Sequence, residues 1–302
     1  MNILLTGSSG FIGSFFTSNY PIKRHVVRSS DKVRYASEHS IANLDESANW
    51  SDAFVDIDTV IHLAGLAHDH SFTEEDYQAV NVSGTLHLAR EATNAGVKRF
   101  VFVSSIGVNG TITTETPFSN NSVPNPHNAY SQSKYDAEVG LNNLAKDTGI
   151  EVVIVRPTLV YGPDAPGNFG ALTQLIHKFP FLPFALVNNK RNFISVQNLC
   201  DLLFTCASHP KAPGNIFLAS DCESVSIKEF SNAIAVGLGG PLIQLPVPVG
   251  LMKFLGKLFN KPTMVQQLVG NLEVDSSNLQ HVLGWSAPYT MKQAMSFLSG
   301  SK

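Results

Sequence analysis

Short apolar runs alternate with amphipathic stretches along the first two-thirds of the chain. The runs cover residues 3–5, 26–27, 59–63, 100–103 and 152–155. They lack the alternation of apolar and polar residues that a half-exposed strand shows, so they predict strands covered on both faces. Helical spacing of apolar residues lies between them, over 81–94 and 131–146. This order predicts an α/β fold with a doubly wound parallel sheet and right-handed crossovers.

The pattern changes after Gly162 and Pro163, where proline and glycine become dense and strand-like runs become sparse. We therefore expect a first domain over residues 1–162 and a smaller C-terminal α/β domain mainly over 163–302. A helix is expected over 167–178, and the chain should return to the large sheet within 192–217.

One later stretch, 251–259, is apolar and carries Lys253 and Lys257 on one side. A helix lying on a membrane surface is one interpretation. Because the stretch is short and has only two charges, a helix in the core or in a subunit contact is favoured.

Composition narrows the class of protein. Of the 302 residues, 43% are hydrophobic and 15% are charged, which is the balance of a globular chain. The formal net charge of −3 argues against nucleic acid or an anionic membrane as the main partner. No run reaches the ~18 apolar residues of a membrane span. The N-terminus lacks the pattern of a signal peptide, so we expect a cytoplasmic protein.

Cysteine and histidine usage does not indicate a metal site. Cys200, Cys206 and Cys222 include no CxxC pair, and we expect three buried free thiols. The segment His68-Asp69-His70 contains metal-binding residue types. One short cluster without further ligands is more typical of a solvated loop, so we expect no metal.

A glycine-rich turn, Thr6-Gly7-Ser8-Ser9-Gly10-Phe11-Ile12-Gly13, follows the first predicted strand and opens a helix that Pro21 bounds. In dinucleotide-binding folds one glycine permits the turn, one lets the backbone approach a pyrophosphate, and one lets helix and strand pack closely. The helix N-terminus then offers free N–H groups to the phosphates. Because the strand before and the helix after are both present, the turn predicts a Rossmann-type domain rather than a merely structural glycine turn.

The end of the second predicted strand bears on the choice of cofactor. NAD-binding folds usually place an acidic residue there for the ribose 2′-OH, whereas an arginine suits the 2′-phosphate of NADP. The strand ends in Arg28, and Asp31 follows three residues later. We favour NADP(H) on the strength of Arg28, with NAD(H) as the alternative.

Tyr130 and Lys134 begin a predicted helix, and their spacing of four places them on one face. A free phenol has a pKa of about 10, and a nearby ammonium lowers it by favouring the phenolate. Lys134, together with the positive ring of an oxidised nicotinamide, is expected to make Tyr130 a usable base. Ser104 and Ser105 end the strand over 100–103, at the edge where functional residues collect in such sheets.

These motifs occur together in the order found in a known family. The chain resembles the extended short-chain dehydrogenases/reductases of the nucleotide-sugar epimerase/dehydratase group over nearly its whole length. Besides the glycine turn, the resemblance rests on His62-Leu63-Ala64-Gly65, Asn81-Val82-Ser83-Gly84-Thr85, Ser104-Ser105, Tyr130 to Lys134, Arg156-Pro157, Val160-Tyr161-Gly162-Pro163 and Leu283-Gly284-Trp285.

The resemblance implies a role for each matching residue. Tyr130 would be the general acid/base, Lys134 its partner, and Ser105 the hydrogen-bond donor to the reacting sugar oxygen. Arg191 matches an arginine that holds the substrate diphosphate, and Asn168 a neighbouring contact. The cofactor would also contact residues around the strand ends, namely Gly7, Ser9, Gly10, Phe11, Ile12, Gly13, Arg28, Asn43, Leu63, Ala64 and Gly65.

Two segments depart from the family pattern. Val108-Asn109-Gly110 stands where the family often has a tyrosine in the central position. Many sugar epimerases carry a second diphosphate arginine ahead of the segment that here begins at Asp275, but residues 270–277 contain none. The grip on a nucleotide diphosphate would therefore depend more on Arg191.

Three functions compete at this point. The favoured one is an NADP(H)-dependent reductase of the C4 keto group of a UDP-linked sugar. The alternative is a UDP-hexose or UDP-N-acetylhexosamine 4-epimerase with tightly bound NAD. A non-catalytic redox sensor is a third class, which the intact set of Ser105, Tyr130 and Lys134 argues against. The expected partner is a nucleotide-diphosphate sugar, and a homodimer is one expected assembly.

Overall fold

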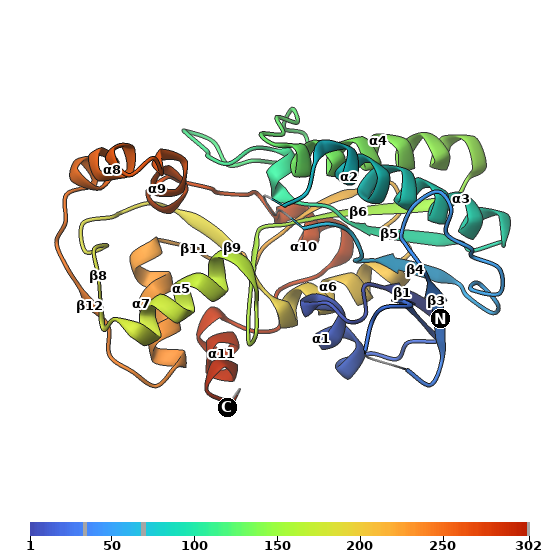
Figure 1. The fold of residues 1–302 in the computed structure, drawn as a ribbon, viewed down its shortest axis with the longest axis horizontal. Helices are drawn as coiled ribbons and strands as arrows, with labels where there is room; N and C mark the ends of the chain where they lie inside the picture. Colours follow the sequence, from blue (N-terminus) through green and yellow to red (C-terminus); the bar gives the residue numbers. More distant parts are fainter. Residues whose placement is uncertain (33–34, 68–70, 301–302) are drawn as a thin grey trace.

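A seven-stranded parallel sheet forms the larger of two lobes in the computed structural model, which describes residues 1–32, 35–67 and 71–300 (Figure 1). The strand order is β10-β6-β5-β4-β1-β2-β3. The bounds are β1 Ile3–Thr6, β2 Arg24–Arg28, β3 Glu38–Ile41, β4 Thr59–His62, β5 Arg99–Val103, β6 Glu151–Pro157 and β10 Ile216–Ala219. The predicted doubly wound parallel fold is confirmed.

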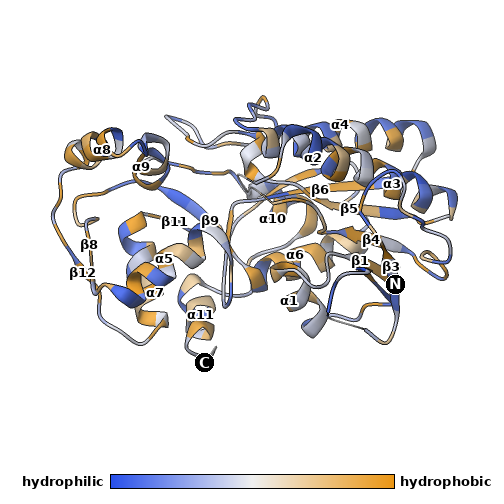
Figure 2. Cartoon of the chain, in the orientation of Figure 1, coloured by the Kyte–Doolittle hydropathy of each residue, from blue (hydrophilic) through white to orange (hydrophobic). Residues whose placement is uncertain are grey.

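Successive residues of the central strands point to opposite faces of the sheet, and both faces are covered. Leu5, Val101 and Val153 join a core with helices α1 (Phe11–Asn19) and α6 (Val196–Ser208). Leu4, Phe100 and Val152 join a second core with α3 (Thr85–Asn94) and α4 (Ala129–Thr148). In Figure 1 the two helix layers lie below and above the sheet, and Figure 2 shows the apolar strands between them. Double burial explains why these strands read as unbroken apolar runs.

The helix expected over 81–94 begins earlier than its apolar pattern suggested. It begins with α2 (Glu74–Tyr77), continues as a π-helical segment over Gln78–Gly84 and runs into α3. A capping box between Thr73 and Asp76 begins it. The π-helical segment contains Asn81, which the site uses.

The smaller lobe contains two short sheets and five helices of the described chain. One sheet has the order β11-β9-β7 and the other pairs β12 with β8. Their bounds are β7 Leu159–Tyr161, β8 Phe181–Leu182, β9 Arg191–Ser195, β11 Ser224–Val225 and β12 Ile243–Gln244. The helices are α5 Gly167–Lys178, α7 Ile227–Gly237, α8 Val249–Leu258, α9 Pro262–Val269 and α11 Met291–Ser296. An aromatic core that includes Tyr161, Phe169, Phe193 and Phe230 lies between them.

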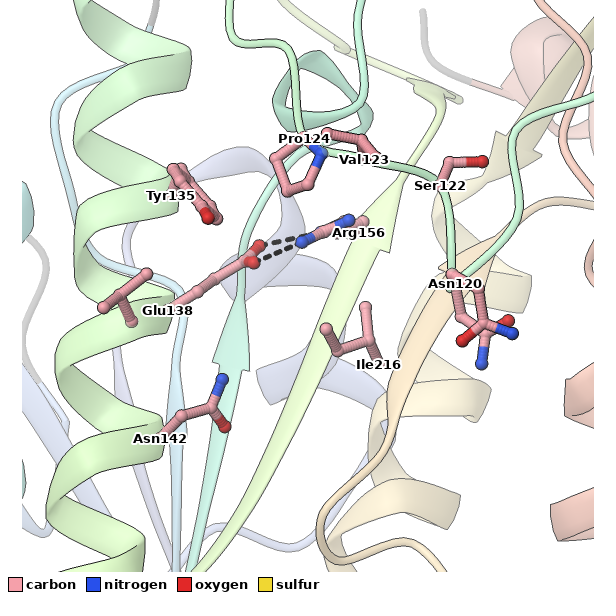
Figure 3. A pocket seen from close by; sticks show the side chains of 11 residues that line it. Asn120, Ser122, Val123, Pro124, Tyr135, Glu138, Asn142, Arg156 and Ile216 are labelled. Carbon is pink, nitrogen blue, oxygen red and sulfur yellow. Dashed lines mark hydrogen bonds and ion pairs between the residues drawn. The ribbon is translucent and has the colours of Figure 1, made fainter.

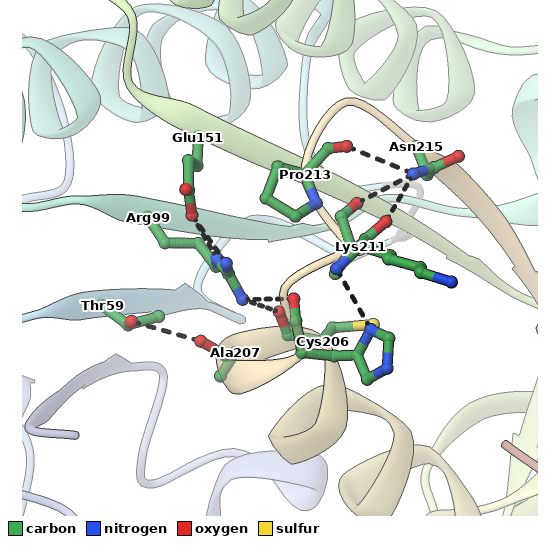
Figure 4. Close-up of polar contacts among 10 residues, drawn as sticks. Thr59, Arg99, Glu151, Cys206, Ala207, Lys211, Pro213 and Asn215 are labelled. Carbon is green, nitrogen blue, oxygen red and sulfur yellow. Dashed lines mark hydrogen bonds and ion pairs between the residues drawn. The ribbon is translucent and has the colours of Figure 1, made fainter. Parts of the chain in front are cut away.

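The last strand of the large sheet comes from the C-terminal half of the chain. After α6 the chain turns back as β10, which pairs with β6. Helix α10 (Ser277–Leu283) packs onto the face of the sheet that α6 also covers. Arg99, the first residue of β5, holds the end of α6 against the sheet (Figure 4). Its Nη1 donates to the carbonyls of Cys206 and His209 at 3.0 Å, and its Nε donates to the Glu151 carboxylate. These contacts lie at the amino ends of the strands, opposite the glycine-rich turn of residues 6–13.

Cys200 and Cys206 are buried, but Cys222 is exposed in a positive-φ turn, so the expectation of three buried thiols is wrong for one of them. Among the described residues no helix has the length and apolar character needed to cross a bilayer, and no cluster of potential metal ligands occurs there. The segment His68-Asp69-His70 lies outside the described residues.

Candidate active site

The glycine turn lies at the carboxyl end of β1, and its backbone contacts leave no room for a side chain at Gly7 or Gly13. Gly7 has φ +72°, and a Cβ there would lie 2.8 Å from the Ala64 nitrogen. A Cβ on Gly13 would lie 2.0 Å from the Gly7 oxygen. Gly10 donates its N–H to that oxygen at 3.0 Å and precedes α1 without a side-chain cap. The first N–H groups of α1 are therefore not capped by a side chain, as a phosphate-binding helix end requires.

Asp31 is joined to this turn at the end of β2. Its carboxylate accepts hydrogen bonds from the Ser9 hydroxyl and the Arg28 backbone N–H, both at 3.1 Å. It also forms an ion pair with Arg28 Nη2 at 3.3 Å, although most of the Arg28 side chain is exposed. Burial raises the pKa of Asp31, but these hydrogen bonds outweigh it and the net shift is downward. The acidic residue is thus held ionised beside the glycine turn, with Arg28 as its partner.

The adenosine side of the expected cofactor site follows β3 and β4. Asn43 is exposed just after β3. Leu63, Ala64 and Gly65 follow β4, and the Ala64 N–H donates to the Thr6 hydroxyl at 3.1 Å. Gly65 has φ +156°, and a Cβ there would lie 3.4 Å from Lys134 Nζ. The segment after β4 therefore lies between the glycine turn and Lys134.

Two buried polar residues, His62 and Asn81, stabilise the segment that follows β4. The sequence analysis included them only as members of the family motifs. His62 bridges the hydroxyls of Thr6 and Thr85 at 2.7 and 2.9 Å. Burial, aided by the charge of Lys134, lowers the pKa of His62 to about 3, so the ring is neutral. Asn81 bonds both backbone groups of Leu66, accepting from its N–H at 2.8 Å, and donates to Ser133 at 3.0 Å.

Ser105, Tyr130 and Lys134 come together at the carboxyl ends of β5 and β6. Tyr130 lies in the first turn of α4, which a capping box between Asn128 and Ser131 begins. Its phenol is hydrogen-bonded to the Ser105 side chain. Lys134 lies one turn further, and its Nζ donates to the Val103 carbonyl at 3.1 Å. The tertiary structure thus assembles the three residues that the family resemblance singles out.

The electrostatics of the triad differ from the sequence expectation in one respect. Burial raises the pKa of Tyr130 to about 12, although the hydrogen bond from Ser105 opposes the shift. The lowering expected from Lys134 does not outweigh burial in the chain without a cofactor. The Lys134 ammonium donates to the Val103 carbonyl and lies 4.8 Å from the centroid of the Phe102 ring. In the chain by itself, Tyr130 is a protonated phenol at neutral pH.

Lys134 is itself perturbed, because it is almost fully buried. Burial lowers its pKa from 10.5 to about 8, and the charge of Glu138 partly offsets this. Glu138 lies one helical turn after Lys134 and forms a buried ion pair with Arg156 (Figure 3). Ser104 donates to the same carboxylate, while Arg156 also donates to Asn109 Oδ1 at 2.9 Å. Asn109, where the family pattern differs, therefore completes a buried network behind Lys134.

The two substrate residues expected in the smaller lobe lie on different elements. Asn168 is exposed in the first turn of α5. Arg191 begins β9, and its Nη1 donates to the carbonyls of Gln267 and Gly270 at the end of α9. Burial lowers the pKa of Arg191 to about 10, so it remains charged at neutral pH. Part of its donor capacity is thus used to cap a helix.

A single extended segment connects Arg191 with the loop that follows Ser105. Residues 271–275 hydrogen-bond on one side to Lys190 and Asn192, which flank Arg191. On the other side they bond to Thr113 and Phe118 in the loop after the Ser105 turn. The segment that lacks the second family arginine therefore joins the two lobes next to the candidate site.

A parallel sheet with this glycine turn, together with a Ser-Tyr-Lys set at the strand ends, defines an extended short-chain dehydrogenase/reductase. Residues 3–219 match the NAD dependent epimerase/dehydratase family. The chain belongs to that family, as its sequence motifs predicted. It is an NAD(P)-dependent enzyme of the nucleotide-sugar epimerase/oxidoreductase class.

Relatives of this chain include epimerases along its whole length. It is 40% identical over 307 residues to a UDP-glucose 4-epimerase of Vibrio cholerae, covering 97% of this chain and 92% of the relative. It is 25% identical to an Escherichia coli O157:H7 N-acetyl-alpha-D-glucosaminyl-diphospho-ditrans,octacis-undecaprenol 4-epimerase, covering 97% and 93%. The fold matches a Thermotoga maritima UDP-glucose 4-epimerase with UDP-glucose at TM-score 0.77 and 21% identity, covering 100% of this chain and 98% of the other.

Proposed function

We propose that this protein is a 4-epimerase of a UDP-linked hexose and that it retains NAD(H) as its cofactor. The observation that carries the proposal is the 40% identity to a UDP-glucose 4-epimerase over nearly the whole of both chains. This reverses the preference for a reductase, which rested mainly on Arg28. Since Arg28 is paired with Asp31, its presence is no longer an argument for a cofactor that carries a 2′-phosphate.

The proposed choice of NAD(H) over NADP(H) rests on the position of Asp31. A carboxylate at the end of the second strand accepts hydrogen bonds from the ribose hydroxyls and repels a 2′-phosphate. Asp31 is hydrogen-bonded to Ser9 inside the glycine turn, whereas Arg28 is mostly exposed and its guanidinium is paired with Asp31. An epimerase returns the hydride that it removes, so it has no need of a reduced cofactor pool.

With its pyrophosphate at the glycine turn, NAD would supply the acceptor and donor of the C4 hydride, and return of that hydride to the opposite face of the sugar inverts this carbon. The residues of the chain handle the proton. Tyr130 takes the proton of the C4 hydroxyl and returns it, while Ser105 hydrogen-bonds the phenol and the same sugar oxygen. Because the pKa of Tyr130 is about 12 in the chain alone, it holds its proton until further positive charge is placed beside it.

The smaller lobe is proposed to hold the diphosphate. Arg191 is charged and largely buried, and Asn168 in the first turn of α5 is the further contact that we propose. Charge-assisted bonds from arginine are strong and suit diphosphate oxygens. A sugar carried on a diphosphate is the chemistry shared by the names of both relatives, so the nucleotide part needs its own test.

The test is to incubate the purified protein with UDP-glucose, and separately with UDP-N-acetylglucosamine, without added cofactor. Nuclear magnetic resonance of the sugar protons should show conversion to the C4 epimer. Tyr130→Phe should lower turnover by about 10²-fold or more, while UDP binding stays unchanged. Net oxidation of added NADPH by a UDP-4-keto sugar, with no epimer formed from either UDP-sugar, would instead establish the reductase.

A further inference from the structure

Helices α8 and α9 form a hairpin at the outer end of the smaller lobe (Figure 1). Within α8, only Met252 and Gly256 are buried. Gly256 marks the close approach of the two helices, because a Cβ there would lie 2.7 Å from a Val265 methyl. One narrow face of α8 therefore contacts the protein, and the rest of the helix faces outward.

An apolar stripe runs along the outward surface of α8, which is largely orange in Figure 2. Leu251, Phe254, Leu255 and Leu258 follow the i, i+3, i+4, i+7 spacing of one helix face. Phe254 is 61% exposed, Leu258 65%, and Phe259, which follows, 69%. Isolated exposed apolar residues are ordinary, but a continuous stripe of large ones marks a contact surface. Of the two expectations favoured from the sequence, a helix in the core does not agree with this exposure, whereas a helix in a subunit contact does.

The charge around this stripe has one sign. Lys253 and Lys257 lie one turn apart on α8, and Lys261 stands between α8 and α9; all three are exposed. The sequence from 230 to 272 contains no aspartate or glutamate. Such a segment is unusual in a chain whose formal net charge is −3. The hairpin, here residues 249–269, therefore combines exposed apolar side chains with positive charge only.

We propose that this hairpin binds an anionic lipid surface. Apolar side chains of an amphipathic helix enter the boundary between headgroups and acyl chains, while flanking lysines attract anionic headgroups. Each lysine near such a surface strengthens binding about fivefold, so three provide on the order of a hundredfold. A symmetric contact with a second copy of the chain would place the same lysines against one another, and the hairpin has no acidic residue to pair with them.

Sedimentation of the whole protein with vesicles tests the proposal. Binding is expected to vesicles that contain phosphatidylglycerol, to weaken at high ionic strength, and to be weak with phosphatidylcholine alone. The paired change Lys253→Gln and Lys257→Gln should reduce binding by about 25-fold. Phe254→Ser with Leu258→Ser should also reduce it by at least about tenfold. Because all four side chains are exposed, the fold should survive, and melting curves would verify this.

Matched controls are exposed residues elsewhere in the chain: Val236→Ser on α7, and Lys98→Gln with Lys146→Gln on the large lobe. These variants should bind as the wild type does. Equal binding to both kinds of vesicle, or hairpin variants that bind like the controls, would overturn the proposal. Absence of binding to phosphatidylglycerol vesicles would overturn it as well, and a dimer that Phe254→Ser with Leu258→Ser dissociates would then assign the surface to a second copy. None of these measurements uses substrate, so their outcome is independent of the proposed epimerase activity.

Discussion

Replacing Lys134 with methionine should stabilise the protein near neutral pH while removing most of its activity. Lys134 is almost fully buried, and burial lowers its pKa from 10.5 to about 8. Methionine keeps a long apolar stem of similar size but carries no charge. The variant therefore removes the cost of the buried ammonium and also removes the charge that the site uses.

The size of the effect follows from the pKa. Each pKa unit corresponds to about 1.4 kcal/mol between protonation states, so at neutral pH the buried charge costs ~3 kcal/mol. The variant also loses the hydrogen bond from Lys134 to the Val103 carbonyl, worth about 1 kcal/mol. A net gain of ~2 kcal/mol in the free energy of unfolding is expected at pH 7.

The sign of the pH dependence distinguishes this cause from others. Between pH 8 and 10.5 the folded wild type has released the Lys134 proton while the unfolded chain retains it. Because the unfolded state then binds more protons, the wild type gains stability as pH rises through this window. The advantage of Lys134→Met should therefore fall by ~2 kcal/mol between pH 7 and pH 10 and disappear near pH 10.

Urea unfolding of both proteins at pH 7 and pH 10 measures this difference, since other titrating groups cancel between them. Lys146→Met, on the exposed end of the same helix, is the control and should change stability by less than about 0.5 kcal/mol. If Lys134→Met were less stable than the wild type at both pH values by the same amount, the ammonium would be stabilising and the reasoning would be refuted.

Three further predictions concern binding. Gly13→Ala should abolish cofactor binding, because its methyl group would meet the Gly7 oxygen at 2.0 Å; calorimetry with NADH that shows wild-type affinity would contradict the proposed turn geometry. Asp31→Asn should weaken NAD(H) about tenfold or more relative to NADP(H); an unchanged ratio would mean that Asp31 does not read the ribose. Arg191→Ala should weaken UDP about ten- to hundredfold, with the exposed neighbour Lys190→Ala as control; equal UDP binding in the two variants would remove Arg191 from the diphosphate site.

The local pattern of apolar residues was sufficient to predict most strands of the large sheet. The central strands are buried on both faces, so their apolar runs are visible in the sequence, and the glycine turn combines a motif with its flanking elements. The edge strand β3 was missed because Glu38-His39-Ser40-Ile41 is mostly polar and buries only Ile41. Its strand conformation depends on pairing with β2, a contact between separate segments that periodicity does not record.

The candidate triad was predicted from spacing and resemblance, but its electrostatics were not. Burial determines the pKa values of Tyr130 and Lys134, and burial depends on helices and strands that are distant in the sequence. The pairing of Glu138 with Arg156, eighteen residues apart, and the bond from Ser9 to Asp31 arise in the same way. Burial and these contacts changed two inferences made from single residues: the expected lowering of the Tyr130 pKa and the assignment of Arg28 to a 2′-phosphate.

The hairpin of α8 and α9 shows most clearly what the sequence determines and what tertiary packing determines. Residues 251–259 already showed an apolar helix with lysines on one side, and that much follows from spacing alone. Which face of the helix contacts the protein was decided by the close approach of α9 at Gly256, which buries Met252 and leaves the stripe through Phe254 and Leu258 exposed. Sequence periodicity determines that a helix has an apolar face, but only tertiary packing determines whether the protein itself covers that face, because burial is a property of the surroundings and not of the segment.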